Sequence, residues 1–507
     1  MNETDVAPAA SERRLHPWSW LFVLIQQLKQ FILPLIALLF FGQRANDDGP
    51  WWTNLAPLIA IGVLAATSLL RYFTYRYRIG SDVLSIRDGW LHRSLREIPF
   101  ARIHNVVVHQ SLLHRMFGVA EVRLESAGGR KPEAQMQVLR LDEALALERQ
   151  VRQRGHGAAA TPEAAVATVS EGDTLLSLPL GEVVRLGLVS NRGMIVAAAA
   201  FGGAWQLFPR KLMANFVESL VQRTSGYVGQ LHLGLLSTAL AVVVLLALAM
   251  LLLRGLSVLL ALLQYYGFRL SEAQRRLTVE RGLLARLRTS VARRRVQAWT
   301  LHEGVLHRLL KRRSLRIDTA VAQQGQNDQR TLKELAPIAT PEACDALVRH
   351  LLPQAQWPRE QWRSVGTDQW WRLCLFTVVW VPLAVVAASW QFGAWGLLPL
   401  LWLPWAAFKA RRRVQRMGWS VDERLVAVRG GWWTRWWRFA ELDKLQALRL
   451  ERGPLDRRCG TASLWLDTAG ANAATAPPLR LQFVPLAEAQ ALYAELSRTL
   501  ARRRMRW

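Results

Sequence analysis

Cysteine is scarce in this 507-residue chain, and its three copies, Cys344, Cys374 and Cys459, form no CxxC pair. A disulfide framework or a structural zinc site needs several cysteines at close, regular spacings. We therefore expect neither, which agrees with domains that face a reducing compartment.

The sequence also lacks the motifs that carry common enzyme chemistry. It contains no GxSxG elbow, no GxxxxGK[ST] phosphate loop and no GxGxxG after a strand. Its nearest approach to a zinc motif is a pair of histidines five residues apart, in HQSLLH from His109 and HEGVLH from His302, whereas HExxH needs a spacing of four. The sequence thus predicts no metal, no cofactor and no enzyme activity.

Carboxylates are missing from the interior of the long apolar segments, where Lys29 is the clearest charged residue. Proton-coupled transport normally needs an acidic group within the membrane, so the sequence disfavours a transporter of that kind. Transport or flipping of a lipid or small solute through the membrane region stays open as the alternative function.

Long apolar runs, by contrast, are abundant. Six runs are long enough to cross a bilayer and nearly free of charge: residues 18–41, 51–70, 193–209, 231–253, 371–390 and 392–408. They lie in three pairs, which predicts three transmembrane hairpins. Arginines flank the outer ends of these pairs, at Arg13, Arg76 and Arg411 among others, whereas the first hairpin loop carries Asp47 and Asp48. Positive charge beside short loops marks the cytoplasmic side, so both termini are expected there.

Lysine is rare, so the formal net charge of +27 is carried almost entirely by arginine. No nucleic-acid-binding motif accompanies this charge, and we expect no nucleic-acid partner. Charge that sets topology, a surface held against anionic lipid and an ordinary solvated face all fit the pattern. The strongest lipid-facing set comprises Arg286, Arg288, Arg293, Arg294, Arg295, Lys311, Arg312 and Arg313.

The chain contains an internal repeat in three copies, at residues 84–127, 277–320 and 426–469, which align without gaps. Each copy follows one pair of apolar runs. Short alternating strands turn at an equivalent glycine, Gly89, Gly282 or Gly431, and a helix-like tail closes each unit. A small curled sheet plugged by that helix would bury the apolar face of both.

The first copy, with IPFARIHNVVVHQSLLHRMFGVAEVRL after its glycine turn, resembles the bacterial membrane-flanked pleckstrin-homology-like (PH-like) domain. Three copies with paired spans resemble the YdbT-type membrane proteins of bacteria. The resemblance implies a multi-domain membrane α+β protein: six transmembrane helices in three hairpins, each followed by a small PH-like β-barrel with a C-terminal capping helix. It also implies a smaller one-domain membrane PH-like relative as a partner and, more loosely, a part in resistance to membrane-active peptides. A homo-oligomer stays open.

The expected domains follow from the runs and the repeat. They are a first transmembrane hairpin at 18–70, a PH-like domain at 72–153, a linker at 154–182, a second hairpin at 183–263, a second PH-like domain at 265–353, a third hairpin at 370–408 and a third PH-like domain at 414–502.

Carried over residue by residue, the resemblance marks equivalent basic positions in the three copies. They are Arg102, Arg295 and Lys444, then Arg115, Arg308 and Arg457, with His104 and Asn105 beside the first and Arg293 and Arg294 beside the second. Arginine presents a fork of donors suited to phosphate or carboxylate, so we expect these residues to bind a partner or an anionic headgroup. A structural ion pair or a loop anchor is the competing interpretation.

A tryptophan cluster distinguishes the third copy: Trp432, Trp433, Trp436 and Trp437. Tryptophan rings prefer the bilayer interface, so we expect this hairpin to rest among headgroups, with core packing as the alternative. Together these features predict a non-enzymatic scaffold in the bacterial inner membrane, whose cytoplasmic PH-like domains bind a partner protein, anionic lipid or both.

Overall fold

The computed structural model describes most of the chain beyond its first hairpin. The described residues are 13–14, 16–25, 27–28, 31, 56–80, 83–89, 93–100, 103–126, 134–154, 173–207, 211–215, 217–219, 222, 235–319, 332–353, 356–468 and 476–502. Lys29, most of the first apolar run and residues 155–172 of the predicted linker at 154–182 lie outside the described residues.

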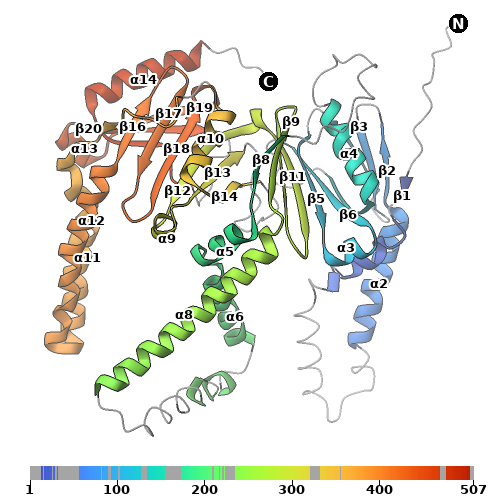
Figure 1. Ribbon diagram of the computed structural model, residues 1–507, viewed down its shortest axis with the longest axis horizontal. Helices are drawn as coiled ribbons and strands as arrows, with labels where there is room; N and C mark the ends of the chain where they lie inside the picture. The colour runs from blue at the N-terminus through green and yellow to red at the C-terminus, as the bar shows by residue number, and fades with distance from the viewer. Residues whose placement is uncertain are drawn as a thin grey trace.

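Each repeat consists of a short strand, a membrane segment and a module of six strands closed by a helix (Figure 1). Repeat 1 has β1 (Arg13–Arg14), α2 (Ala56–Thr74), β2 (Arg76–Ile79), β3 (Val83–Asp88), β4 (Ser94–Pro99), β5 (Ile103–Gln110), α3 (Leu112–Met116), β6 (Val119–Ser126), β7 (Ala134–Arg140) and α4 (Leu141–Arg154). Repeat 2 has β8 (Asp173–Ser177), α5 (Leu180–Val189), α6 (Arg192–Leu207), α8 (Leu235–Tyr265), β9 (Arg269–Ala273), β10 (Arg276–Arg281), β11 (Arg286–Ala292), β12 (Val296–Glu303), α9 (Val305–Leu309), β13 (Arg313–Thr319), β14 (Glu334–Ala339) and α10 (Pro341–Leu351). Repeat 3 has β15 (Arg363–Ser364), α11 (Trp370–Phe392), η6 (Gly393–Leu401), α12 (Trp402–Arg416), β16 (Gly418–Val421), β17 (Leu425–Gly430), β18 (Arg435–Glu441), β19 (Leu445–Glu451), α13 (Pro454–Cys459), β20 (Thr461–Thr468), β21 (Arg480–Pro485) and α14 (Leu486–Ala501). We call β2–α4 module 1, β9–α10 module 2 and β16–α14 module 3.

The predicted glycine turns are confirmed. Gly89, Gly282 and Gly431 have φ of 107°, 114° and 82°, a region that residues with a Cβ rarely adopt. At Gly282 and Gly431 an added Cβ would also lie within 2 Å of a backbone oxygen. The turn chemistry of the repeat therefore follows directly from its sequence.

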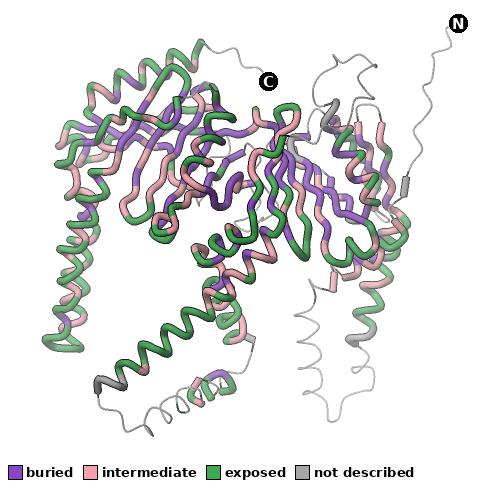
Figure 2. Tube along the Cα trace, viewed as in Figure 1, coloured by how far each residue is buried: buried purple, intermediate pink, exposed green. Residues whose placement is uncertain are grey.

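The predicted tail helices are confirmed as α4, α10 and α14. In α10 the side chains of Leu347 and Leu351 are buried, with Ala343 packed beside them against the core of module 2. Figure 2 shows buried residues concentrated in the strands and on the inner faces of these helices. Each tail helix thus closes its own module.

The sheets do not stop at the module boundaries. A seven-stranded sheet has the order β7-β6-β5-β11-β10-β9-β8, so β5 of module 1 pairs with β11 of module 2. A second seven-stranded sheet has the order β14-β13-β12-β18-β17-β16-β15, in which β12 of module 2 pairs with β18 of module 3. Each module therefore consists of two half-sheets, and modules 1 to 3 are fused in a row instead of hanging as separate barrels.

The membrane segments extend from one side of this row (Figure 1). Among the described residues, two stretches are long and apolar enough to cross a membrane, 239–265 and 367–416, and α5 with α6 forms a further candidate bent by 54°. Within 367–416 the chain turns at Gly393, and the Cys374 thiol contacts the Ala406 carbonyl at 3.6 Å, so α12 packs back on α11. By length and composition the described residues thus contain two such stretches, or three with the bent pair, and the full set of six spans stays a prediction.

Close packing fixes the second membrane segment at the bend between α5 and α6. A Cβ on Gly187 would lie 2.4 Å from the Val258 backbone, and one on Gly193 would lie 2.4 Å from the Ser257 hydroxyl. Arg254 of α8 donates to the Leu188 carbonyl at 2.8 Å, which satisfies a carbonyl at the end of α5. This arginine within the apolar helix α8 therefore has a structural partner.

Candidate anion-binding site

Two of the predicted basic residues anchor one module to the next. Arg115, in the short helix α3 of module 1, donates to the Leu283 carbonyl in the β10–β11 turn of module 2 at 2.9 Å. Arg308, at the equivalent position in α9 of module 2, donates to the Trp433 carbonyl in the β17–β18 turn of module 3 at 3.1 Å. Their series continues at Arg457 in α13, which is exposed.

The other predicted basic residues, those of the Arg295 and Lys444 series, also lie at junctions or inside modules. Lys444 donates to the Arg294 carbonyl of module 2 at 3.2 Å. Arg293 approaches Glu272 at 3.4 Å and donates to the Leu351 carbonyl at the end of α10. Burial lowers the pKa of the Arg295 guanidinium, with Arg294 adding to the effect.

The corresponding residues of module 1 are described less fully. Arg102 lies outside the described residues, and so do the side chains of His104 and Asn105, although both residues belong to β5. The backbone of Asn105 pairs with Val291 across the junction.

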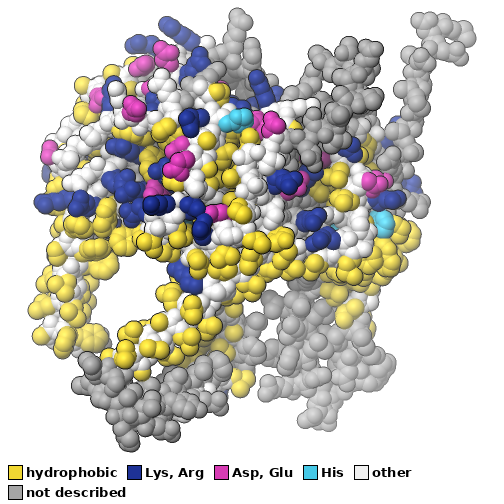
Figure 3. Space-filling model, viewed as in Figure 1, with side chains coloured by type: hydrophobic (Ala, Val, Ile, Leu, Met, Phe, Trp, Pro, Cys, Tyr) yellow, Lys and Arg dark blue, Asp and Glu magenta, His cyan; other side chains and the backbone are white. Residues whose placement is uncertain are grey.

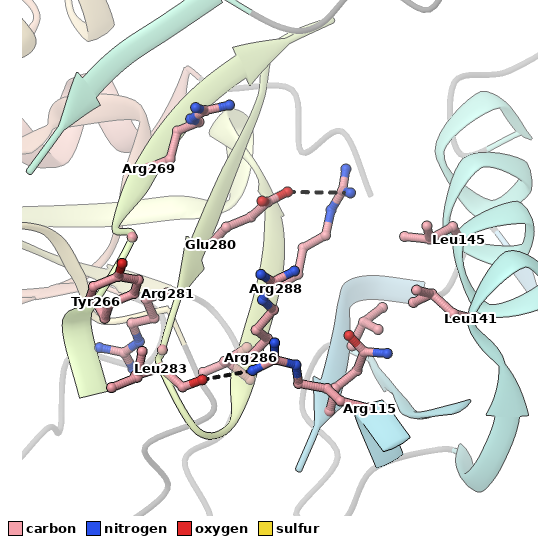
Figure 4. Close-up of a pocket in the computed structure, with 15 residues that line it drawn as sticks. Arg115, Leu141, Leu145, Tyr266, Arg269, Glu280, Arg281, Leu283, Arg286 and Arg288 are labelled. Carbon is pink, nitrogen blue, oxygen red and sulfur yellow. Dashed lines mark hydrogen bonds and ion pairs between the residues drawn. The ribbon is translucent and has the colours of Figure 1, made fainter. Parts of the chain in front are cut away.

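The joint between modules 1 and 2 encloses a cleft of about 480 Å³. The β9–β11 hairpins of module 2 form one wall, and α3 and α4 of module 1 contribute to the other (Figure 4). Five arginines line it, against one glutamate: Arg115, Arg269, Arg281, Arg286 and Arg288, with Glu280. The cleft is therefore strongly basic, with an apolar side formed by residues such as Leu141 and Leu145.

Three of these arginines are engaged and define the shape of the cleft. Arg288 lies 3.2 Å from Glu148 and 3.3 Å from Glu280. The Arg281 guanidinium lies over the Tyr265 ring at 5.0 Å, and Arg115 holds the turn at Leu283. Carboxylates balance the charge of Arg288, and the other two guanidinium groups contact protein groups, so these three arginines position the wall of the cleft.

The other two arginines face solvent. Arg269 and Arg286 are exposed, and no ion pair ties either guanidinium to a carboxylate in the described part of the chain. Arg269 stands opposite Glu280 on the neighbouring strand, but that carboxylate approaches Arg288. Two guanidinium groups without a carboxylate partner in the described part of the chain, beside an apolar wall, suit an anionic group attached to a hydrocarbon, such as a lipid headgroup.

The basic set predicted for module 2 is thus divided by the structure. Arg286 and Arg288 line the cleft, while Arg312 donates to Glu182 at 2.8 and 2.9 Å and Arg313 lies 3.4 Å from Glu303. Sequence reasoning missed Arg269, because it stands outside the aligned repeat, directly after the membrane helix. A search for arginine beside the end of a span would have found it.

An apolar rim runs along the side of the modules from which the membrane segments extend. Its members are exposed side chains of turns and short helices: Leu112, Leu113 and Met116 in α3, Leu283 and Leu284 in the β10–β11 turn, Val305, Leu306 and Leu309 in α9, and Trp433 in the β17–β18 turn. Met116 and Leu309 are 79% and 78% exposed. Figure 3 shows hydrophobic side chains gathered along this side with arginines and lysines above them, as expected for a surface that meets the bilayer.

The tryptophan cluster divides between the rim and the joint of modules 2 and 3. Trp432 packs on Trp405 and Phe408, with ring centroids 5.9 and 5.3 Å away, and Trp433 is exposed. Trp437 lies under the Arg313 guanidinium at 4.8 Å, and Trp436 packs against the core of module 3. The interface prediction is untested: the positions of Trp432 and Trp433 fit it, while Trp437 packs between modules 2 and 3 and Trp436 packs on the core of module 3.

No group of three or more histidine, cysteine, aspartate or glutamate side chains that could hold a metal occurs in the part of the chain that the structure describes. The histidines of HEGVLH do meet, with ring centroids of His302 and His307 5.7 Å apart. Burial, with His302 and Arg316 nearby, lowers the pKa of His307 to about 4, so its ring is neutral at physiological pH.

The bacterial PH domain model matches this chain three times, at residues 23–155, 219–352 and 373–500. Each match covers part of a membrane segment and the module that follows it. The chain is also 20% identical to the UPF0699 transmembrane protein YdbT of Bacillus subtilis (strain 168) over 425 residues, which is 81% of this chain and 83% of that protein. No solved structure matches the chain. The chain therefore belongs to the bacterial PH domain family, as a membrane-associated YdbT-type protein that carries three such domains.

Proposed function

We propose that this protein is a non-enzymatic scaffold of the bacterial inner membrane, with three fused modules seated on the cytoplasmic leaflet and an anionic headgroup held in the cleft between modules 1 and 2. The observation that carries the proposal is the pair of available arginines, Arg269 and Arg286, in a cleft whose other arginines are engaged. The apolar rim lies on the side of the modules from which the membrane segments extend, and Leu283 of this rim also lines the cleft.

In the proposed topology six spans form three hairpins, with both termini and all modules in the cytoplasm. The common direction of the membrane segments in Figure 1 supports modules on a single side of the bilayer. The arginines that flank the spans support the cytoplasmic side, because translocated short loops rarely carry them.

A scaffold must hold its modules at fixed positions, and two ion pairs between membrane segments and modules support this. Glu182 of α5 accepts from Arg312 of module 2 at 2.8 and 2.9 Å. Arg372 of α11 donates to Asp456 of module 3 at 2.6 Å. Ion pairs therefore hold modules 2 and 3 to their membrane helices.

Replacing Arg269 and Arg286 together with glutamine should weaken binding of an anionic lipid. Each arginine near an anionic surface contributes about 1 kcal/mol, so we expect a loss of roughly 10- to 30-fold in affinity. Short-chain phosphatidylglycerol titrated into the detergent-solubilised full chain measures this, with phosphatidylcholine as the neutral comparison.

The double replacement of Arg349 and Arg498 with glutamine is the matched control, because it removes the same charge from exposed positions on α10 and α14. Equal weakening by both double variants would show that net charge, not the cleft, governs binding. No preference of the unaltered protein for phosphatidylglycerol would reject the proposed site.

We extend the proposal to envelope defence, because cationic membrane-active peptides bind the same anionic headgroups that the cleft would hold. A strain that lacks the protein should be killed faster by such a peptide. The unaltered gene should restore its survival, and the Arg269→Gln/Arg286→Gln gene should not. Identical killing curves for the deletion strain and its parent would remove this role.

A further inference from the structure

The two junctions between modules have the same construction. Across the first, Thr289 of β11 stands opposite Val107 of β5; across the second, Arg438 of β18 stands opposite Thr300 of β12. Thr289 and Arg438 are equivalent in the gapless repeat, and so are Val107 and Thr300. The pairing register is therefore a property of the repeat itself.

A row built from such junctions leaves one matching strand unused at each end. β4 of module 1 is the counterpart of β11 and β18; among the described strands it ends its sheet, and three of its six residues are exposed. β19 of module 3 is the counterpart of β5 and β12, and it also ends its sheet among the described strands; one of its seven residues is buried, against seven of eight in β12. An unpaired edge strand readily accepts another strand.

The side chains at the two ends repeat a contact of the second junction. There Arg438, only 1% exposed, forms an ion pair with Asp318 of β13 at 2.6 Å. Their equivalents in the repeat are Arg96 on β4 and Asp467 on β20, and both are exposed. The two halves of one ion pair thus lie open at opposite ends of the chain.

Two further residues fit the same register. Leu95 of β4 is 66% exposed, and continuing the repeat places it opposite Leu450 of β19, as Trp437 stands opposite Leu301. Arg449, which would face Arg96, is paired with Glu451 at 2.6 Å, so its charge is balanced. Arg457 is equivalent to the module anchors Arg115 and Arg308, and it is exposed.

We infer that copies of this protein join head to tail, with β19 of one copy paired to β4 of the next. Because the new junction would repeat the two existing ones, it would keep all membrane segments on one side of the row, as a shared bilayer requires. The contact uses two different surfaces, so it generates a closed ring or an extended row.

Disulfide cross-linking in native membranes tests this contact. In a Cys459→Ser background, Leu95→Cys and Leu450→Cys are placed on two differently tagged copies of the full chain, since the remaining Cys344 and Cys374 are buried. Oxidation should link the two tagged copies. When only one of the two cysteines is present, this cross-linked product should be absent. Arg96→Asp should abolish the link, and Asp467→Arg on the partner copy should restore it.

Arg87→Cys paired with Leu450→Cys is the control, because Arg87 is exposed but lies on β3, inside its sheet. Equal linking in the control would mean random collision and would overturn the inference. Absence of the Leu95–Leu450 link in membranes where both copies are folded would overturn the inference as well. Cross-linking of Leu95→Cys to a different protein in place of the second copy would also overturn it.

Discussion

Replacing Arg438 with methionine should lower the melting temperature of the detergent-solubilised protein by roughly 6–20 °C. The change removes one partner of a buried ion pair and leaves Asp318 uncompensated, which typically costs about 3–5 kcal/mol. A loss of 1 kcal/mol lowers Tm by about 2–4 °C for a unit of some 200 residues. Fluorescence-monitored melting of the full chain measures the shift.

The double variant Arg438→Met/Asp318→Leu separates the ion pair from the general packing of the junction. Exchanging a whole buried pair for apolar side chains is often close to neutral, so the double variant should recover most of the lost Tm. The same exchange at the exposed counterparts, Arg96→Met/Asp467→Leu, should leave the Tm of dispersed single copies unchanged. If the Arg438→Met variant has the same Tm as the unaltered protein, the junction between modules 2 and 3 does not depend on this ion pair.

The repeat made the modules predictable, because gapless alignment carries turn glycines and tail helices from one copy to the next. The joining of modules was not predicted. Alternation shows that a strand has a buried face but does not identify the strand beside it. One signal was present: Val106–Val108 in β5 is apolar at consecutive positions, the pattern of a strand covered on both faces.

The basic residues could be located from sequence, but their partners could not. Arg115 and Arg308 were expected to bind a ligand or anchor a loop, and the structure gives them backbone carbonyls of the next module. Arg438 lay in a hairpin that its tryptophans assigned to the membrane interface, yet it is buried in the joint between modules 2 and 3. Arg438 is buried because β12 of the preceding repeat pairs with its strand, β18, and the sequence around Arg438 does not indicate that pairing.

Acid should loosen module 2 from its membrane segment through Glu334. This carboxylate of β14 lies 3.5 Å from Arg192 of α6, 3.5 Å from Arg316 and 3.9 Å from Arg281. Burial alone would raise the pKa of the Glu334 carboxyl, but the arginines around it outweigh burial and lower the pKa below its ordinary value of 4.5. The folded state is therefore stabilised above that value, and the contribution is lost as pH falls through the folded pKa.

Glu334→Gln should reproduce at pH 7 what acid does to the unaltered protein. Three arginines then lose their shared carboxylate, and because two of them remain partly in water we expect a loss of roughly 2–4 kcal/mol. Hydrogen exchange at the end of α8, next to Tyr265, should rise, since the Tyr265 hydroxyl donates to the same carboxylate.

The pH profile provides the decisive comparison, because glutamine does not titrate. Between pH 7 and pH 3 the Tm of the unaltered protein should fall more steeply than that of Glu334→Gln, and the two curves should converge at the acid end. Glu423→Gln is the control, since Glu423 is exposed and its variant should follow the unaltered protein throughout. Parallel curves for the unaltered protein and Glu334→Gln would show that other carboxylates govern the response to acid, and that the joint between module 2 and its helices does not depend on the charge of Glu334.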